Sequence, residues 1–368
     1  MLNRLQALPT SEAQTSSEIE LWNDVRAMTL MDLGRRNGRN PETFKPRKKS
    51  IHVLLHGGLR RRRRQRRSCG WLPGCWRPEP PSPAREPRLE SVPVSDQATE
   101  ESRQIWDSLA SGWDKERAFI NEIEGLVTGR MHEAIGVLPG DTILELCAGP
   151  GEVGLRLAEQ HPEVQVLLTD FAPGMVHAAA NEASRRGLTN VECRPMDAQD
   201  IDLPDGSVDG VLCRYGLMLV PDIAKAFSEV RRVLRPGRVL AYTTWTPPET
   251  NPWMMIFGAA MIQRGHFAPP DEGGIMPLGN VDENSAVARA AGFESVHAEA
   301  IDLPVHYPSF QRYWELNTAI AGPLAVIMKT LPDDEREAVR SQVEEYAAPF
   351  RTGDGLTFPS RRMFVRAS

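Results

Sequence analysis

Three glycines and two acidic residues in the middle of the chain have types and spacing that suit a ligand carrying a ribose. The stretch LELCAGPGEVG leaves an apolar run at Glu145 and continues through Gly149, Gly151 and Gly154 in the pattern G-x-G-x-x-G. Glycine has no Cβ, so the backbone can turn tightly and a ligand can approach it closely. Asp170 closes the next apolar run, nineteen residues after Gly151, where a carboxylate can accept hydrogen bonds from both ribose hydroxyls.

Two cofactor classes fit these residues. Glycines followed by an acid suit NAD as well as S-adenosylmethionine. Glu145 separates the two, because a carboxylate four residues before Gly149 would face an anionic pyrophosphate in an NAD site. S-adenosylmethionine carries an ammonium and a sulfonium at that end, and a carboxylate stabilises both. We therefore favour S-adenosylmethionine. A glycine turn that binds no ligand is the remaining alternative.

Predicted strands and helices alternate around this loop and must position it. Alternation requires crossover connections, so we predict an α/β, Rossmann-like, doubly wound and mostly parallel seven-stranded sheet with helices on both faces. The loop then lies beyond the carboxyl ends of the strands, where ligands bind in such sheets. The last strand is expected to be antiparallel, and two helices are expected over residues 105–131. The predicted strands are 142–147, 164–169, 191–195, 208–214, 238–245, 294–301 and 361–367, and the later helices are 151–161, 173–187, 223–234 and 283–293.

The chain consists of two segments of opposite net charge. Residues 1–93 carry 19 Lys+Arg and 9 Asp+Glu, a net of +10, whereas the remainder carries 24 and 40, a net of −16. The first part is arginine- and proline-rich and is predicted to be a disordered extension. Residues 94–368 are predicted to form one catalytic domain. Its core is expected at 140–245, with helical cap insertions at 246–282 and 303–360.

The arginine run at residues 60–67 leaves the role of the extension open. It could be an arm that binds nucleic acid or a targeting signal. A secretory signal is not expected, because the apolar stretch 51–55 is short and precedes the arginines. The alternative is that the extension does little, and we expect natural translation to begin near Val94. The acidic remainder would repel phosphate, so a nucleic acid partner is not favoured.

The composition also argues against a membrane-spanning protein and against a metal site. No apolar run approaches the ~18 residues that a membrane-spanning helix needs. The five cysteines show no metal-type pairing, so no metal site is predicted. Cys147, Cys193 and Cys213 end predicted strands and are interpreted as small buried thiols rather than reactive ones. This inventory suits a reducing cytoplasm. The oligomeric state is left open.

Five ordered motifs carry a family resemblance. They are ILELCAGPGEVG, LLTDFAPGMV, MDAQDIDLPDGSVDGVL, YGLMLVPD and EVRRVLRPGRVL. With them the chain resembles the class I S-adenosylmethionine-dependent methyltransferases, and is similar to the ubiquinone/menaquinone C-methyltransferase group (methyltransferase type 11). The resemblance covers about residues 105–367 and is most specific over 140–245. It implies S-adenosylmethionine as cofactor.

The resemblance also implies roles for single residues. The amino-acid part of the cofactor would be held by Glu145, Ala148, Gly149 and Gly151, and the ribose by Asp170. The adenine would be contacted by Phe171, Met175, Asp197 and Ala198. Cys213, with Arg214 beside it, would face the methionine part. From the residues alone, Phe171 and Met175 could instead be core, and Asp197 could cap a short helix over AQDI.

The acceptor is expected to be a small apolar or aromatic molecule. Met218 and Leu219 stand where the quinone methyltransferases carry arginine and asparagine, which argues against a quinone precursor. Aromatic candidates for an acceptor pocket, which could equally be core, are Trp106, Trp113, Trp253, Phe257, His266, Phe267, Tyr307, Phe310 and Trp314. No catalytic base is assigned, and the candidates are His132, Tyr215, His266 and His306.

Two other functions stay open beside methyl transfer to a small molecule. An NAD-dependent oxidoreductase would share the glycine loop, although Glu145 and the lack of a Tyr-x-x-x-Lys pair argue against it. An RNA or protein methyltransferase could use the basic arm. However, the Asn/Asp-Pro-Pro-Tyr/Phe tetrapeptide that is common in enzymes methylating amino groups of nucleic acids is missing after the fourth strand.

Overall fold

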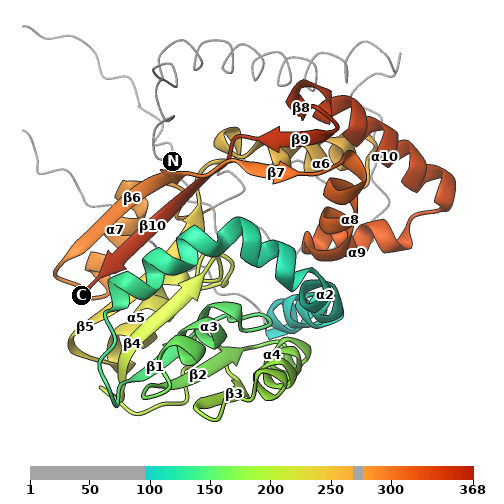
Figure 1. Ribbon diagram of the computed structural model, residues 1–368. Coiled ribbons are helices and arrows are strands. Elements are labelled where there is room, and N and C mark those ends of the chain that lie inside the picture. The colour runs from blue at the N-terminus through green and yellow to red at the C-terminus, as the bar shows by residue number, and fades with distance from the viewer. Residues whose placement is uncertain (1–95, 268–276) are drawn as a thin grey trace, which may run out of the picture. The chain divides into compact units, whose positions relative to one another are not determined.

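The computed structural model describes residues 96–267 and 277–368 (Figure 1). The predictions for residues 1–93, including the disorder and the arginine run, lie outside the described residues, as does part of the predicted insertion 246–282. The described residues group into two compact units. Residues 96–245, 277–301 and 363–368 form a sheet unit, and residues 246–267 and 302–362 form a helical unit. The domain boundaries given above stay a prediction.

Seven strands form one sheet, in the order β3-β2-β1-β4-β5-β10-β6. β1 pairs in parallel with both β2 and β4, and the β2–β3 and β4–β5 pairs are parallel too. The chain winds outward in one direction from β1 and in the other from β4, so the switch point lies between these two strands. The bounds are β1 Thr142–Glu145, β2 Gln165–Asp170, β3 Val191–Pro195, β4 Val208–Arg214, β5 Leu234–Trp245, β6 Val296–Asp302 and β10 Arg361–Ala367. The predicted doubly wound, mostly parallel sheet is confirmed.

The last strand is antiparallel, as predicted. The amide of Ser295, just before β6, donates to the carbonyl of Ser368, just after β10. At the other end, the amide of Leu303 donates to the carbonyl of Ser360. The start of one strand therefore meets the end of the other, and Figure 1 shows β10 running opposite to β4.

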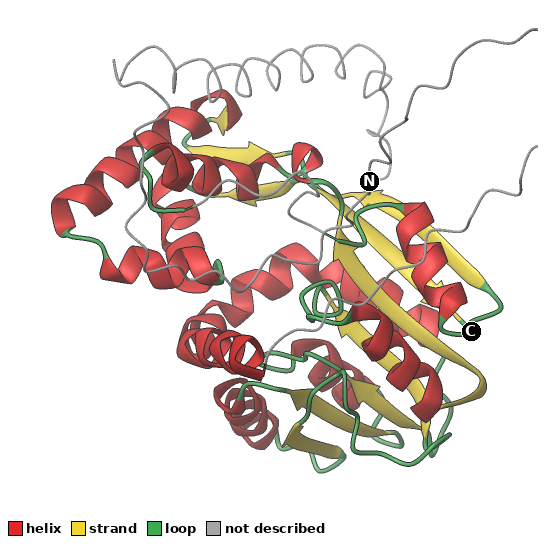
Figure 2. Ribbon diagram, turned by 180° about the vertical axis from the view of Figure 1, so that it is seen from behind, coloured by secondary structure: helices red, strands yellow, loops and turns green. Residues whose placement is uncertain are grey.

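Helices cover both faces of the sheet (Figures 1 and 2). On one face α2, α3 and α4 contact one another, and on the other α5 contacts α7. No helix in the described parts of the chain is both long and apolar enough to cross a bilayer. The bounds are α2 Asp96–Ile135, α3 Glu152–Gln160, α4 Pro173–Arg186, α5 Ile223–Val233 and α7 Val281–Ala290.

The prediction of two helices over residues 105–131 is wrong, because α2 is one continuous helix of 40 residues. The segment holds glycines but no proline, and a glycine inside a helix costs only about 1 kcal/mol. Packing against the sheet outweighs that cost, since Leu109, Val127 and Met131 are almost fully buried. Leu126, an apolar residue of this segment, is 69% exposed, and its neighbour Val127 faces the sheet instead.

Several strand boundaries also differ from the prediction, and those of β1 and β5 have a clear cause. β1 ends at Glu145 rather than Cys147, because Cys147 takes a left-handed conformation with φ 50°. β5 begins at Leu234, directly after α5, whereas the sequence placed a turn at residues 235–237. An irregularity in the β4–β5 register, between Val208 and Gly210, accommodates these extra residues within the strand pair.

The helical unit has its own aromatic core. Tyr313 lies at its centre, with ring contacts to Tyr307 and Phe358 and with its hydroxyl donating to the carbonyl of Trp253 at 2.5 Å. Among the proposed acceptor-pocket aromatics, Phe257, Tyr307, Phe310 and Trp314 are buried, so the core interpretation describes them. The elements are η2 Pro248–Thr250, α6 Pro252–Gln263, α8 Phe310–Ile320, α9 Pro323–Thr330, α10 Asp333–Ala347 and η3 Ala348–Phe350, with a small antiparallel sheet of β7 Val305–Tyr307, β9 Gly355–Phe358 and β8 Arg351–Thr352.

Candidate active site

The loop between β1 and α3 lies at the switch point, and its glycines have distinct roles. Gly149 has φ 56°, and a Cβ there would meet nothing within 4 Å, so its backbone is open to a ligand. Gly151 has φ 84°, and its Cβ would lie 2.8 Å from Leu168 and 2.9 Å from Ala179. Gly151 is therefore required both by its left-handed backbone and by close packing, whereas Gly149 leaves space beside its backbone for a ligand.

Gly154 allows helix α3 to lie directly on the sheet. A Cβ at this position would be 2.3 Å from Leu168 Cδ2 and 2.6 Å from the Glu145 carboxylate. Real side chains do not approach that closely, so the substitution Gly154→Ala must move α3 away from β1 and β2.

We expect Gly154→Ala to lower the free energy of unfolding by about 1–3 kcal/mol, as measured by urea denaturation. Gly129→Ala is the matched control, because Gly129 is also helical and its Cβ would meet nothing within 4 Å. That control should be neutral or stabilising by up to about 1 kcal/mol. Equal destabilisation by both changes would contradict the packing argument.

Asp170 ties the glycine loop to the end of β2. Its Oδ2 accepts from the Gly149 amide at 2.9 Å, and its Oδ1 accepts from the Ala172 amide at 2.9 Å. Burial raises the pKa of this carboxyl, against the lowering effect of the backbone hydrogen bonds. Each carboxylate oxygen has a further lone pair, so the group can bind two more donors. A ribose offers two such hydroxyls.

Glu145 is buried beneath the loop, with 2% of its surface exposed. Its Oε2 accepts from the Gly154 amide at 2.6 Å, near the start of α3. Burial raises the pKa of Glu145 to about 8, although the Gly154 hydrogen bond and the nearby Arg214 charge lower it. A cation brought to this site would favour the ionised carboxylate.

A cluster of buried ions fixes the glycine loop from below. Arg117 of α2 donates to the carbonyl of Pro150 at 2.7 Å and to Glu152 at 3.0 Å. Arg186 of α4 donates to the same Glu152 at 2.7 Å and to Glu182 at 2.7 Å. Three helices thus hold the loop in one conformation, and no local pattern of residues predicted this cluster.

Helix α2 also contacts the end of β4. Arg214 donates from Nη1 to the Thr128 hydroxyl at 2.9 Å, and the Tyr215 hydroxyl donates to Glu124 at 2.6 Å. Tyr215 has a left-handed φ of 61°, and its ring stacks on Trp245 with centroids 4.1 Å apart. Glu124 and Thr128 are one helical turn apart and buried. Sequence analysis missed both; the available signal was two polar residues at i, i+4 among the apolar residues of the helix.

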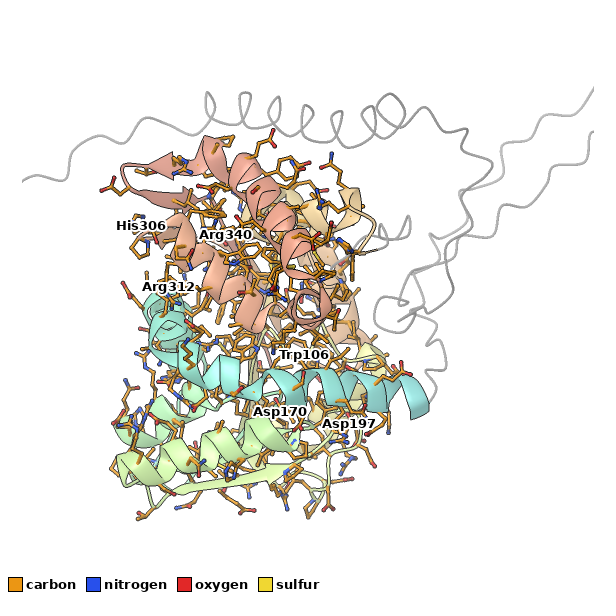
Figure 3. The ribbon with its side chains drawn as sticks, turned by 90° about the vertical axis from the view of Figure 1, so that its right-hand side faces the viewer. Trp106, Asp170, Asp197, His306, Arg312 and Arg340 are labelled. Carbon is orange, nitrogen blue, oxygen red and sulfur yellow. The ribbon has the colours of Figure 1, made fainter. Side chains whose placement is uncertain are left out.

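An aromatic cluster flanks Asp170. Phe171, Trp106 and Trp113 pack against the buried Met175 together with Ala110 and Ala172. Figure 3 shows Trp106 on α2, on the side where Asp170 and Asp197 lie. The structure thus brings Phe171 and Met175 together, but it places Met175 in a small core, with 3% of its surface exposed.

Asp197 follows β3 in a turn. Its Oδ1 accepts from the Gln199 amide at 2.8 Å, and an isolated bridge joins Asp197 to Asp200. Residues 197–200 are not helical, so the alternative of a helix cap is wrong. Ala198 is buried, with 4% exposed.

The thiols at the sheet are buried or half-buried. Cys213 is fully buried, and a Cβ on Gly216 would lie 2.9 Å from the sulfurs of both Cys147 and Cys213. A hydrogen bond that the Cys147 thiol donates to Cys213, together with burial, raises the pKa of Cys147 well above its usual value. Burial raises the pKa of Cys193 to about 11. Thiolate is the reactive form, so the raised pKa of Cys147 and Cys193 favours the interpretation of unreactive thiols, although only Cys213 is fully buried.

The four base candidates have different surroundings. His132 has Nε2 2.9 Å from the Val153 carbonyl and a pKa lowered by burial, so it joins α2 to α3. His266 lies 2.9 Å from Glu335, and His306 lies 3.1 Å from Thr357, both within the helical unit. Tyr215 follows β4 at the same sheet edge as the glycine loop. No three His, Cys, Asp or Glu side chains gather as a metal site among residues 96–267 and 277–368.

Comparison with known proteins identifies relatives of the segment that carries this site. A family described as "Methyltransferase domain" matches residues 143–237. The demethylmenaquinone methyltransferase of Thermus thermophilus is 36% identical over 115 residues, which are 31% of this chain and 52% of that protein. The demethylmenaquinone methyltransferase of Listeria monocytogenes is 32% identical over 124 residues, 33% of this chain and 52% of that protein. The chain spans about half the length of these curated relatives.

Among solved structures, the YcgJ protein of Bacillus subtilis aligns with a TM-score of 0.46 and 18% identity, over 65% of this chain and 96% of that one. The segment matched by the family begins in β1 and ends in β5. It therefore includes every candidate cofactor residue from Glu145 to Cys213.

Proposed function

We propose that this chain, whose residues 143–237 belong to the class I S-adenosylmethionine-dependent methyltransferase family, transfers a methyl group from S-adenosylmethionine to a small apolar or aromatic acceptor. The observation that carries the proposal is that two acidic side chains, Asp170 and Glu145, both contact or underlie one open glycine loop. Asp170 holds the Gly149 amide, and Glu145 lies buried below the same loop.

The residues present fit this cofactor. Gly149 leaves its backbone accessible, and Asp170 has two free acceptor positions at the tip of β2. We propose that Glu145, Ala148, Gly149 and Gly151 hold the amino-acid part and that Asp170 holds the ribose. We propose that the adenine is contacted by Phe171, Met175, Asp197 and Ala198, and that Cys213 faces the methionine part.

Bound S-adenosylmethionine would supply a methyl group on a positively charged sulfur, which a nucleophile displaces in line. The chain then has to align the acceptor and exclude water. The stacked pair of Tyr215 and Trp245 is one aromatic group that the sheet unit places at the ends of β4 and β5. A general base is needed only for an acceptor that is protonated at neutral pH.

An apolar acceptor is supported by the two relatives, which are named as demethylmenaquinone methyltransferases. The acceptor of this chain need not be the same molecule. Met218 is buried and Leu219 is 47% exposed, where the quinone enzymes were expected to carry arginine and asparagine. We propose a small molecule as partner, without nucleic acid, and the cytoplasm as location. NAD is disfavoured because Glu145 would lie beneath its pyrophosphate.

Ligand-dependent melting tests this function. S-adenosylhomocysteine at about 100 times its Kd should stabilise the folded protein by about 2.7 kcal/mol and raise the melting temperature by several degrees, whereas NADH should have no effect. A shift with NADH alone would favour the oxidoreductase. With cofactor binding established, the labelled methyl group can be followed into pools of aromatic small molecules to identify the acceptor.

A further inference from the structure

Helices α8, α9 and α10 of the helical unit line an open pocket of about 370 Å³ (Figure 1). Helix α8 contacts both of the other helices. A volume of this size lies at the lower end of the range for small-molecule sites. All lining residues belong to the helical unit, so the glycine loop contributes nothing to this pocket. They are Trp314 and Thr318 of α8, Met328 and Lys329 of α9, and Arg336 of α10.

The most buried lining residues offer an apolar surface. Trp314 is 8% exposed and Met328 is 2% exposed. The Trp314 ring packs on Phe257 with centroids 5.3 Å apart. Arg336 donates from Nε to the carbonyl of Met328 at 3.3 Å and from Nη2 to that of Leu331 at 2.9 Å, which fastens the end of α9 to α10. An indole and a thioether held in this way suit an aromatic or other apolar ligand body.

The polar groups of the pocket are mainly hydrogen-bond donors. The ring N–H of Trp314 donates to no group among residues 96–267 and 277–368, and its nitrogen is not covered by protein. This N–H is therefore available to a molecule in the pocket. Lys329 is exposed and makes neither a hydrogen bond nor an ion pair within the same ranges. The Thr318 hydroxyl donates to the carbonyl of Trp314 at 2.9 Å, so its hydrogen is already used.

Lys329 gives the pocket its net positive charge. Arg336 is also a cation, but its Nη1 donates to Asp333 at 2.8 Å, so the pair is neutral. Glu335, on the same turn of α10, pairs with Arg264 at 2.6 Å. No carboxylate is among the lining residues. A carboxylate has two oxygens that accept hydrogen bonds and donate none, so it complements an ammonium and an indole N–H together.

We propose that this pocket binds a small organic carboxylate with an apolar or aromatic body. The body lies against Met328 and the Trp314 ring, and the carboxylate accepts from the Lys329 ammonium and the Trp314 N–H. Lys329 and Trp314 are thus binding residues, and Arg336 is a positioning residue that holds the end of α9. The inference goes beyond the proposed function, because binding here requires neither S-adenosylmethionine nor methyl transfer.

Two probes of nearly the same shape test the charge requirement. α-Naphthoate carries a carboxylate, whereas α-naphthamide has the same rings and no charge. The full chain is labelled with fluorotryptophan, and the fluorine signal that is lost in Trp314→Phe identifies Trp314 among the eight tryptophans. α-Naphthoate should shift this signal with a Kd of about 1 mM or lower, and α-naphthamide should bind more weakly. A Trp314 signal that α-naphthoate does not move would overturn the proposal.

Three variants extend the titration. Lys329→Gln removes the charge from an exposed side chain and should weaken α-naphthoate binding about threefold to tenfold, with α-naphthamide binding unchanged within about twofold. Lys115→Gln is the matched control, because Lys115 is an exposed lysine of α2 in the sheet unit and its replacement changes the net charge equally. Thr318→Leu adds bulk to the pocket wall and should weaken the binding of both probes.

The outcomes separate this inference from simpler explanations. Equal losses in Lys329→Gln and Lys115→Gln would show that α-naphthoate responds only to net charge. Equal losses of both probes in Lys329→Gln would show that Lys329 only shapes the pocket, and unchanged binding in Thr318→Leu would place the probes elsewhere. Each of these results would overturn the proposal. Because the titration contains no cofactor, its failure leaves the proposed methyl transfer standing, and a protein that binds no S-adenosylhomocysteine leaves this pocket standing.

Discussion

Asp170→Asn should reduce the affinity for S-adenosylhomocysteine at least 100-fold while the protein stays folded. The carboxylate accepts the amides of Gly149 and Ala172, so it both shapes the loop and presents its remaining lone pairs to the ligand. Replacing one oxygen with an amide nitrogen turns a donor toward a backbone donor and removes the charge. Two charge-assisted hydrogen bonds to ribose hydroxyls account for about 3 kcal/mol or more, which corresponds to the expected loss.

The measurement is calorimetry at constant pH, with circular dichroism to verify the fold. Asp202→Asn is the matched control, because Asp202 follows β3 and is exposed, and its affinity should equal that of the wild type. An Asp170→Asn protein that binds with wild-type affinity would remove Asp170 from the ribose site. A loss in both variants would point to net charge rather than to the geometry at β2.

The sheet was predictable because its signals are local. Strands such as Val208–Arg214 are short apolar runs bounded by turn residues, and helix α4 begins at a proline and ends before a glycine with a left-handed φ of 69°. These patterns come from backbone conformation and burial, which each segment displays by itself. The alternation of such segments then leaves few topologies.

The continuity of α2 was not predictable in the same way. Gly112 and Gly125 interrupt its pattern, and their local cost favours a break, whereas burial of Leu109 and Met131 against distant strands favours one helix. The balance depends on tertiary contacts that no window of sequence contains. For the same reason the exposure of the apolar residue Leu126 could not be predicted from its local sequence.

The residues of the candidate site also differ in whether the sequence alone could identify them. Glycines and acids at strand ends have a type and spacing that point to a ligand, so Asp170 and Glu145 were found from sequence. Arg117, Glu124 and Thr128 act from a helix that ends before β1, and each becomes visible only when α2 packs against the loop and β4. The roles proposed for the cofactor residues stay predictions until binding is measured.

The buried carboxyl of Glu145 is both a proposed binding group for the cofactor and a source of instability in the ligand-free protein. Its carboxyl has a pKa of about 8 in the folded chain, against a usual value of 4.5, because it is buried. The folded protein therefore holds this proton more tightly than the unfolded chain does. The contribution of Glu145 to stability should be greatest below about pH 4.5, where both states are protonated, and should fall as the pH rises toward 8, by at most about 4–5 kcal/mol.

Glu145→Gln should abolish this pH dependence. At pH 9 the ligand-free variant should unfold at higher denaturant concentration than the wild type, by about 2–4 kcal/mol, because a neutral amide replaces a buried charge while its oxygen still accepts from Gly154. The same variant should bind S-adenosylhomocysteine more weakly, since the ammonium loses its anionic partner. Glu133→Gln, at an exposed position of α2, should change neither property. A Glu145→Gln protein that is less stable than the wild type at pH 9 would mean that the charge is already compensated within the fold. Increased stability together with weakened binding would instead show that the buried acid is retained for the ligand, at the expense of the empty protein.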